Sequence, residues 1–239
     1  MRRVLPGLLC AFACFFPPSA SGQSARLGGR VQAKPKVAVR GDSAGAYKSR
    51  SLKYAKLFDY EHLKNVVVYA EAVSTASMDA PGLAVSTAAG EGVSVAFEMT
   101  RGRAGVKPVF LAAPAASPVV FKNLTPDSIT VYSGGRAPKN FMVTIDPGAQ
   151  KEVFLDALGF YPVFCLEYPR AQTSIFAASP YFSGIDAEGR YAFDLPPGKY
   201  KVTAWHARLP SRSLEVELEA GEARQLDFTL SVEELPEIQ

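Results

Sequence analysis

One stretch near the end of the chain, residues 181–230, constrains the fold most strongly. Within it, residues 186–189 have the composition of a tight turn, and residues 195–198 (Leu-Pro-Pro-Gly) must end a strand. Neither proline can donate a hydrogen bond to a neighbouring strand, and Gly198 can adopt a positive φ. Apolar and polar side chains alternate at residues 190–194 and again at 200–204. This pattern predicts two short strands of a β-sandwich.

Short apolar or alternating runs, separated by turn residues, continue along the rest of the chain. The run at 66–70 is almost continuously β-branched, which predicts a strand buried on both faces. Further strands are predicted at 93–99, 109–111, 119–122, 129–133, 141–145, 150–155, 159–166, 174–178, 213–219 and 224–230. Many short strands with almost no helical periodicity indicate an all-β protein with a β-sandwich architecture.

Composition and charge exclude several classes of protein. The chain has 239 residues, 48% of them apolar and 21% charged, which suits one large or two small cores. A net charge of +3 is too small to indicate a nucleic-acid-binding protein. Basic residues predominate at 24–64 and acidic residues at 215–239, so the two ends of the chain either lie near each other or form separate solvated faces.

The N-terminus has the features of a secretory signal. Arg2 and Arg3 precede an apolar run at 4–16, and small residues at 20–22 suit cleavage. The apolar run is shorter than the about 20 residues that span a bilayer, and no later run is long enough. We therefore expect a soluble periplasmic or secreted protein without a transmembrane span. Lipid attachment at Cys14, in place of ordinary cleavage, remains an alternative.

Cleavage would leave Cys165 as the single cysteine of the mature protein, because Cys10 and Cys14 belong to the signal. One cysteine cannot form an internal disulfide, even in an oxidising compartment. The sequence leaves open whether Cys165 is a buried apolar residue, a metal ligand or a site of intermolecular linkage.

Residues 189–193, 195–200 and 226–230 resemble the carboxypeptidase regulatory-like (transthyretin-type) β-sandwich. The resemblance lies in the spacing of the two turns and in the final alternating strand. It implies that strands at 29–32 and 66–71 belong to the same sandwich, with an insertion between them and residue 181.

Residues 118–127, 129–133, 145–150 and 159–169 resemble the cupredoxin (plastocyanin-like) fold. In that family, copper is held by two histidines, a cysteine and a methionine. Position by position, the resemblance places Cys165 at the thiolate, Ile129 and Tyr168 at the histidines, and Ala171 at the methionine. Three of the four donors are missing, and a lone thiolate lacks the nitrogen ligands of a trigonal copper site. The resemblance therefore implies a degenerate copper site.

Together these observations predict an all-β chain with two β-sandwich domains, one cupredoxin-like and one carboxypeptidase regulatory-like. The expected parts are a signal peptide at 1–22, an irregular basic arm at 23–50, the first part of the regulatory-like sandwich at 51–75, a cupredoxin-like insertion at 76–178, the second part of the regulatory-like sandwich at 179–232 and an acidic tail at 233–239.

Candidate sites are few. Cys165 with His206 and an acid such as Glu167 is a weak candidate metal site, and His62 is expected to be solvated. Cys165, His206 and Asp186 could form a catalytic set, but no flanking motif supports one, so no catalytic residue is predicted.

Four aromatic residues are candidates for a binding patch, since aromatic side chains are enriched where binding energy concentrates. They are Tyr161, Tyr168, Tyr181 and Trp205. Core packing is the alternative role for these rings.

The sequence thus predicts a non-enzymatic exported protein without a cofactor. We expect a structural or binding module of the cell envelope whose partner is a protein or a glycan, and not a nucleic acid. The alternative is a copper-binding or electron-transfer protein that uses Cys165. A hydrolase accessory activity that depends on His206 is a third, remote possibility.

Overall fold

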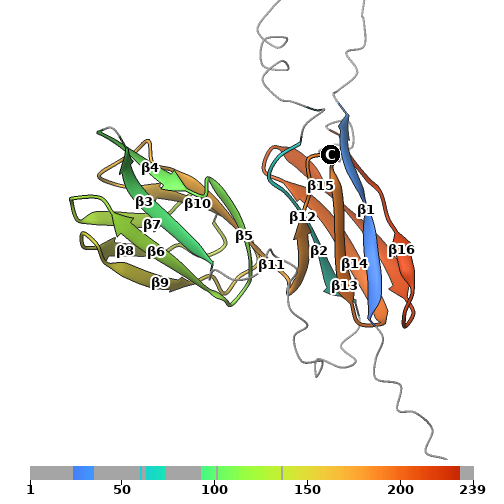
Figure 1. Cartoon of the computed structure of the whole chain (residues 1–239). Helices are drawn as coiled ribbons and strands as arrows, with labels where there is room; N and C mark the ends of the chain where they lie inside the picture. Colours follow the sequence, from blue (N-terminus) through green and yellow to red (C-terminus); the bar gives the residue numbers. More distant parts are fainter. Residues whose placement is uncertain are drawn as a thin grey trace, which may run out of the picture.

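The computed structural model describes residues 24–34, 60, 63–73, 93–100, 102–135 and 137–231. Seventeen strands and no helix occupy these residues, and they form two β-sandwiches that lie beside each other (Figure 1). The prediction of an all-β chain with two β-sandwich domains is therefore confirmed. No helix with the length and apolar character needed to cross a membrane occurs in these residues.

The first sandwich is built from one continuous part of the chain. Its sheets have the strand orders β5-β11-β10-β7-β8 and β4-β3-β6-β9. The side chains between the sheets form one core, which includes Phe97, Phe121 and Val163. The strands are β3 (Ser94–Thr100), β4 (Arg103–Lys107), β5 (Phe110–Pro114), β6 (Pro118–Leu124), β7 (Ile129–Ser133), β8 (Met142–Ile145), β9 (Gln150–Phe154), β10 (Gly159–Cys165) and β11 (Thr173–Ala178).

The second sandwich combines two parts of the chain that are far apart in sequence. One sheet has the order β13-β1-β16, with β17 also paired to β1, and the other has the order β12-β2-β14-β15. The expected insertion at 76–178 encloses β3 to β11. The strands of the second sandwich are β1 (Ala25–Lys34), β2 (Val66–Ala72), β12 (Tyr181–Gly184), β13 (Arg190–Leu195), β14 (Gly198–His206), β15 (Leu209–Leu218), β16 (Ala223–Gln225) and β17 (Phe228–Ser231).

β1 corrects one expectation. A mostly irregular arm is predicted at 23–50, with a strand implied only at 29–32, but residues 25–34 form a ten-residue strand in the middle of a sheet. Leu27 and Val31 are buried in the core, whereas Gly28 and Gly29 interrupt the alternation that would mark a strand in the sequence. The remaining arm, the predicted signal at 1–22, His62 and the acidic tail at 233–239 lie outside the described residues.

The predicted single strand at 224–230 is two strands in the structure. β16 pairs in parallel with Arg26 to Gly28 of β1, and β17 pairs in parallel with the later half of β1. Between them the carbonyl of Leu226 accepts a hydrogen bond from the Tyr191 hydroxyl at 2.6 Å, and the Asp227 carboxylate accepts one from the Arg30 amide at 2.8 Å. These contacts take the place of ladder pairing where β1 changes its neighbour.

The turn predicted at 186–189 is confirmed. Asp186 Oδ1 accepts hydrogen bonds from the backbone N–H groups of Glu188 (3.0 Å) and Arg190 (2.8 Å). Gly189 has a φ of +78°, which L-residues with side chains rarely adopt. The turn joins β12 of one sheet to β13 of the other, so it lies at the end of the second sandwich.

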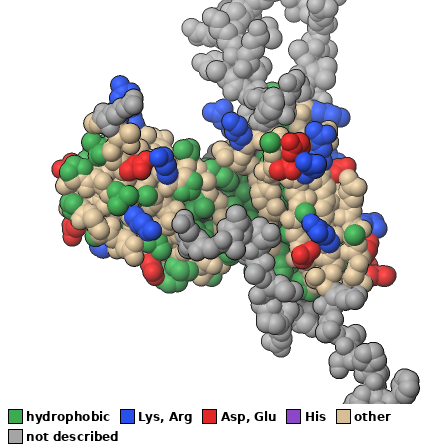
Figure 2. All heavy atoms as spheres, in the orientation of Figure 1, with side chains coloured by type: hydrophobic (Ala, Val, Ile, Leu, Met, Phe, Trp, Pro, Cys, Tyr) green, Lys and Arg blue, Asp and Glu red, His purple; other side chains and the backbone are tan. Residues whose placement is uncertain are grey.

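An aromatic cluster connects the two sandwiches. Trp205 of β14 lies with its ring 4.2 Å from that of Phe176 in β11 and 5.2 Å from that of Phe160 in β10, measured between ring centroids. Val67 of β2 is fully buried in the same cluster. Figure 2 shows hydrophobic side chains along this junction. The predicted burial of both faces of residues 66–70 is confirmed, because one face of β2 contacts its own core and the other contacts the first sandwich.

Candidate functional site

The residues at the predicted copper position lie together at one end of the first sandwich. Cys165 is the last residue of β10, and Ile129 is the first residue of β7. Tyr168 and Ala171 lie in the loop at 166–172, where the Ala171 amide donates a hydrogen bond to the Tyr168 carbonyl at 2.8 Å. Ile129, Cys165 and Ala171 belong to the hydrophobic core, and Tyr168 packs against it. The structure therefore brings these four positions into one apolar cluster.

A buried asparagine fixes the neighbouring loop at 124–128. The Asn123 side-chain nitrogen donates to the carbonyls of Asp127 (2.8 Å) and Ile145 (2.9 Å). Its side-chain oxygen accepts from both the backbone amide and the hydroxyl of Thr125. Because Asn123 has no exposed surface and both of its polar atoms are bonded, this loop has one well-defined position relative to β7.

The donor set does not fit copper. Ile129 is 0% exposed and Ala171 is 1% exposed, so hydrocarbon occupies two of the places where the resemblance puts ligands. A trigonal copper site needs two imidazole nitrogens beside the thiolate. In the described part of the chain, no three His, Cys, Asp or Glu side chains lie close enough together to hold a metal ion.

The thiol of Cys165 is held in its protonated form. Burial raises the pKa of Cys165, and the negative charge of Glu167 raises it further. The thiol donates to Glu167 Oε2 at 3.6 Å, and the same oxygen accepts a hydrogen bond from the Thr130 amide at 2.6 Å. Partial burial opposes ionisation of Glu167, but hydrogen bonds led by that from the Thr130 backbone hold its pKa below the ordinary value. A protonated, buried thiol is a poor nucleophile and a poor metal ligand.

Tyr168 closes the same end of the sandwich. Its hydroxyl donates to Asp127 Oδ2 at 2.5 Å, and this hydrogen bond raises the pKa of Tyr168. The bond links the loop after β10 to the loop before β7. At the position expected for the second histidine, the side chain therefore stabilises the loops.

His206 lies in the other sandwich. Its ring Nδ1 accepts a hydrogen bond from the Arg208 amide at 3.1 Å, and the backbone of Lys64 also hydrogen bonds to the ring. Burial lowers the pKa of His206, and the hydrogen bond with the Lys64 backbone opposes that shift. Cys165 lies in the core of the first sandwich, and in the described residues no three His, Cys, Asp or Glu side chains lie close enough together to hold a metal ion, so the structure does not assemble the candidate metal site. Asp186, of the candidate catalytic set, bonds to Arg190 and to the amides of its own turn.

The four aromatic candidates for a binding patch are separated in the structure. Tyr161 is 1% exposed, and its hydroxyl donates to the Ala157 carbonyl, so it is a core residue. Tyr181 packs edge-on against Tyr200 of the second sandwich, with centroids 6.2 Å apart. Trp205 fills the junction between the sandwiches, and Tyr168 lies at the closed end of the first. These four rings therefore do not form one surface patch, and a binding role for Tyr168 or Tyr181 stays a prediction.

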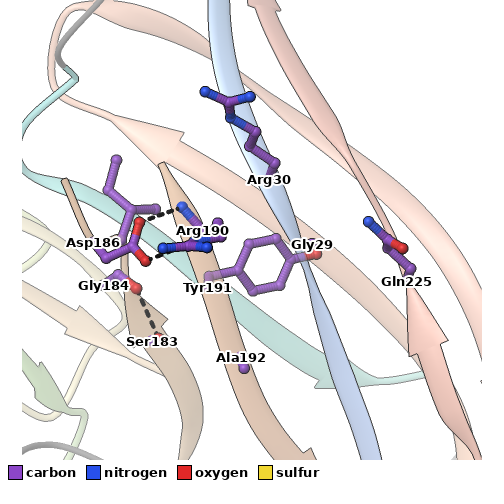
Figure 3. Close-up of a pocket in the computed structure, with 10 residues that line it drawn as sticks. Gly29, Arg30, Ser183, Gly184, Asp186, Arg190, Tyr191, Ala192 and Gln225 are labelled. Carbon is purple, nitrogen blue, oxygen red and sulfur yellow. Dashed lines mark hydrogen bonds and ion pairs between the residues drawn. The ribbon is translucent and has the colours of Figure 1, made fainter. Parts of the chain in front are cut away.

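An open cavity of about 740 Å³ on the second sandwich was not predicted from the sequence. Its lining comes from β1, β13, β16 and the β12–β13 segment, and includes Gly29, Arg30, Asp186, Arg190, Ala192 and Gln225. Figure 3 shows Arg30 and Gln225 on neighbouring strands, with Arg190 bonded to Asp186 nearby. Arg30 and Arg190 come from distant parts of the sequence, and only the register of β1 with β13 brings them together.

Comparisons with known proteins show similarity only at the level of structure. No protein-family model matches the chain, and no curated protein does. A purple cupredoxin from Nitrosopumilus maritimus is 16% identical, with a TM-score of 0.32, over 36% of this chain and 99% of its own. The oxidised form of plastocyanin from Dryopteris crassirhizoma is 10% identical, with a TM-score of 0.31, over 35% of this chain and 98% of its own.

A copper-containing nitrite reductase from Thermus scotoductus is 19% identical, with a TM-score of 0.33, over 42% of this chain and 26% of its own. All three similarities cover less than half of this chain. What this chain binds must therefore follow from its own side chains.

Proposed function

We propose that this protein is a non-enzymatic, exported binding module of the cell envelope, in which the first sandwich is a scaffold that no longer binds copper. One observation carries the proposal: the end of the first sandwich where copper would lie is closed by packing and by hydrogen bonds. Ile129 and Ala171 fill it with hydrocarbon, and Tyr168 bonds to Asp127 across it.

The electrostatics of Cys165 also favour a scaffold over an electron carrier. An electron carrier of this type needs a thiolate, yet burial and the adjacent Glu167 both raise the pKa of the thiol. In addition, the thiol proton of Cys165 is donated in a hydrogen bond to Glu167. The same features argue against nucleophilic catalysis by Cys165, because the thiolate is the reactive form.

The second sandwich carries the features that suit binding. The described residues of its β12–β13 end present charged side chains of both signs around an open cavity, with Arg30, Asp186 and Arg190 among them. Figure 2 shows charged side chains gathered at this end of the sandwich. The resemblance of this sandwich to the carboxypeptidase regulatory-like family stays a prediction, as does export by residues 1–22.

Copper titration monitored by absorption spectroscopy tests the proposal. We expect no intense thiolate-to-copper band when Cu(II) is added to the purified protein, because only one donor of the trigonal set is present. The combined variant Ile129→His, Tyr168→His and Ala171→Met restores the missing donor types and serves as a positive control.

A strong band in the wild-type protein that disappears in Cys165→Ser would show that the alternative, a copper or electron-transfer function, is right. Copper that binds without this band, and binds equally well to Cys165→Ser, would instead indicate a site elsewhere and would leave the scaffold role of this site intact.

A further inference from the structure

We propose that the free edge of β5 binds an extended, uncharged segment of a partner protein, which adds to the sheet as one more strand. This inference rests on the proposed binding function and deepens it by naming the class of partner and the site. β5 is an edge strand of its sheet in the first sandwich, and β12 is an edge strand of its sheet in the second. Figure 1 shows these two strands on the sides of the sandwiches that face each other.

The backbone of β5 offers hydrogen-bonding groups at the spacing of a strand. On one side β5 pairs in parallel with β11, where the Val109 carbonyl accepts a hydrogen bond from the Ser174 amide at 3.1 Å. Backbone groups of alternate residues in a strand face opposite neighbours, so those of Phe110 and Ala112 point away from β11. Within the described ranges, no backbone group of another residue bonds to that side of β5. A row of donors and acceptors of this kind is matched by an extended polypeptide.

Neither β5 nor β12 carries the charges that protect sheet edges. Natural proteins place charged side chains on exposed edge strands, which prevents the addition of another strand. Such charges are present in the edge strands β4 (Arg103 and Lys107), β9 (Lys151 and Glu152) and β15 (Glu215 and Glu217). β5 (Phe-Leu-Ala-Ala-Pro) and β12 (Tyr-Phe-Ser-Gly) have none. The two edges that face each other at the junction are therefore open to a further strand.

An open hollow of about 610 Å³ lies beside β5 and gives a further strand room. Lys64 and Asp186 are the charged residues of its lining, and their charges are opposite. The apolar part of the lining consists of Val66, Phe110, Leu111, Ala112, Phe182 and Ile185. A segment with apolar side chains and no charge of its own matches this lining, because side-chain pockets beside an edge strand give strand addition its specificity.

The hollow continues the packing that already joins the sandwiches. The ring of Phe110 lies 6.5 Å from that of Trp205 and nearly parallel to it, and Phe182 belongs to the same buried cluster. Side chains of an added strand would extend this apolar interface, while backbone bonds to β5 would fix the position of the strand. This combination favours a segment of a protein over a glycan, because a glycan lacks both the regular amide spacing and the apolar side chains.

Fluorescence anisotropy with the full-length protein tests the inference. The probe is a labelled octapeptide of alternating valine and threonine, followed by a pair of lysines for solubility. The comparison peptide has proline in place of each threonine. We expect the protein to bind the first peptide and not the second, because proline cannot donate a hydrogen bond to a neighbouring strand.

Ala112→Pro removes an amide that points to the free edge. This variant should bind the valine–threonine peptide roughly tenfold or more weakly. The pairing of β5 with β11 should survive, because an edge strand tolerates proline where the missing N–H faces solvent. Peptides N-methylated at every second residue, in the two possible phases, test the same bonds with the protein unchanged. At least one of the two phases should lose binding.

Met142→Pro in β8 is the matched control. β8 is the opposite edge strand of the same sheet and is also uncharged, and Met142 is 73% exposed. The Ser133 amide donates to the carbonyl of the preceding residue, Phe141, so the Met142 amide points away from β7. This variant should bind the valine–threonine peptide as the wild type does.

The inference is overturned if Ala112→Pro and Met142→Pro bind the peptide equally well, if the wild type does not bind it, or if both methylated peptides bind as the parent does. A dimer in sedimentation that Ala112→Pro dissolves would show a second copy of the chain at this edge and would also overturn it. Thermal melting of each variant separates loss of binding from loss of folding. The copper titration examines the opposite end of the first sandwich, so either proposal can fail while the other holds.

Discussion

Asn123 shows how a single polar residue can be buried in the first sandwich without destabilising it. All of its polar atoms have partners within the protein, and no buried side-chain nitrogen or oxygen of the described residues lacks one. Removing one partner of such a group leaves it desolvated and unbonded, which costs about 1–3 kcal/mol. The buried thiol of Cys165 likewise has a partner, Glu167 Oε2.

His206 should make the stability of the protein depend on pH. Burial lowers the pKa of this side chain, so the folded state favours neutral imidazole. Below the ordinary histidine value of about 6.5, the unfolded chain binds a proton that the folded protein does not. We expect the free energy of unfolding to fall as the pH decreases from that value, and the fall to end once the pH passes the lower pKa of the folded state.

Denaturant unfolding of the wild type and of His206→Gln across this range measures the effect. The difference between their unfolding free energies should change with pH only in the window below about 6.5, and His62 contributes equally to both proteins. A difference that stays constant with pH would contradict the expected effect of burial on His206.

β1 is the element on which the second sandwich depends. It pairs with β13 on one side, and on the other it pairs first with β16 and then with β17. Where β1 changes from pairing with β16 to pairing with β17, the backbone at Leu226 passes very close to Gly29. A Cβ atom built on Gly29 would lie 1.9 Å from the Leu226 carbonyl oxygen. Only glycine fits this close approach of two backbones.

Gly29→Ala should therefore destabilise the protein. The atom in the way belongs to the backbone, so β1 or the segment at Leu226 must move, at a cost of about 1–3 kcal/mol. Chemical denaturation measures the change. Gly105→Ala in β4 is the control, because a Cβ there meets nothing within 4 Å, and it should shift stability by no more than about 0.5 kcal/mol. Equal effects of the two substitutions would show that Leu226 does not constrain Gly29.

The elements that the sequence predicts well are those with an uninterrupted local pattern. Residues 129–133 are predicted as a strand and form β7, because their alternation depends only on neighbouring residues. β1 is harder to recognise, since two glycines remove the apolar signal and its partners lie near the other end of the chain. For the same reason, the local sequence of residues 224–230 does not predict that they divide into two strands, β16 and β17.

The candidate sites also differ in how far the sequence predicts them. Cys165, Ile129, Tyr168 and Ala171 occupy one end of a single sandwich, and it is the resemblance to the cupredoxin fold that places them together in the sequence analysis. The cavity beside Arg30 depends on strand register between distant segments, and spacing gives no signal for it. The four aromatic candidates lie apart for another reason: composition does not tell whether a ring faces solvent, a core or a second domain.

At the scale of the whole molecule, the two sandwiches are joined through aromatic packing as well as through the chain. Trp205 contacts Phe160 and Phe176, and Phe110 lies 6.5 Å from it with its ring nearly parallel. Offset and tilted aromatic pairs of this kind add to the free energy gained by burial. We therefore expect the two sandwiches to unfold together rather than independently.

Trp205→Ala should make the two sandwiches unfold independently of each other. Loss of the ring removes contacts worth about 2–4 kcal/mol from the junction, while the core of each sandwich is kept. Scanning calorimetry should show one transition for the wild type and two for the variant. Phe164→Ala is the control, because it removes an aromatic pair with Tyr132 in the first sandwich without touching Trp205. Two transitions already present in the wild type would show that the junction does not couple the sandwiches.

The placement of the first sandwich between β2 and β12 sets an order in which the protein can assemble as it leaves the ribosome. The inserted sandwich, from β3 to β11, is contiguous, so all of its strands are available once residue 178 has emerged. The surrounding sandwich must wait for β17, which pairs with residues 31–34 of β1. Domains generally fold as units during synthesis. The nascent chain is thus expected to carry a finished inner domain, with Phe176 and Phe160 already in place, before Trp205 and the closing strands arrive to dock on it.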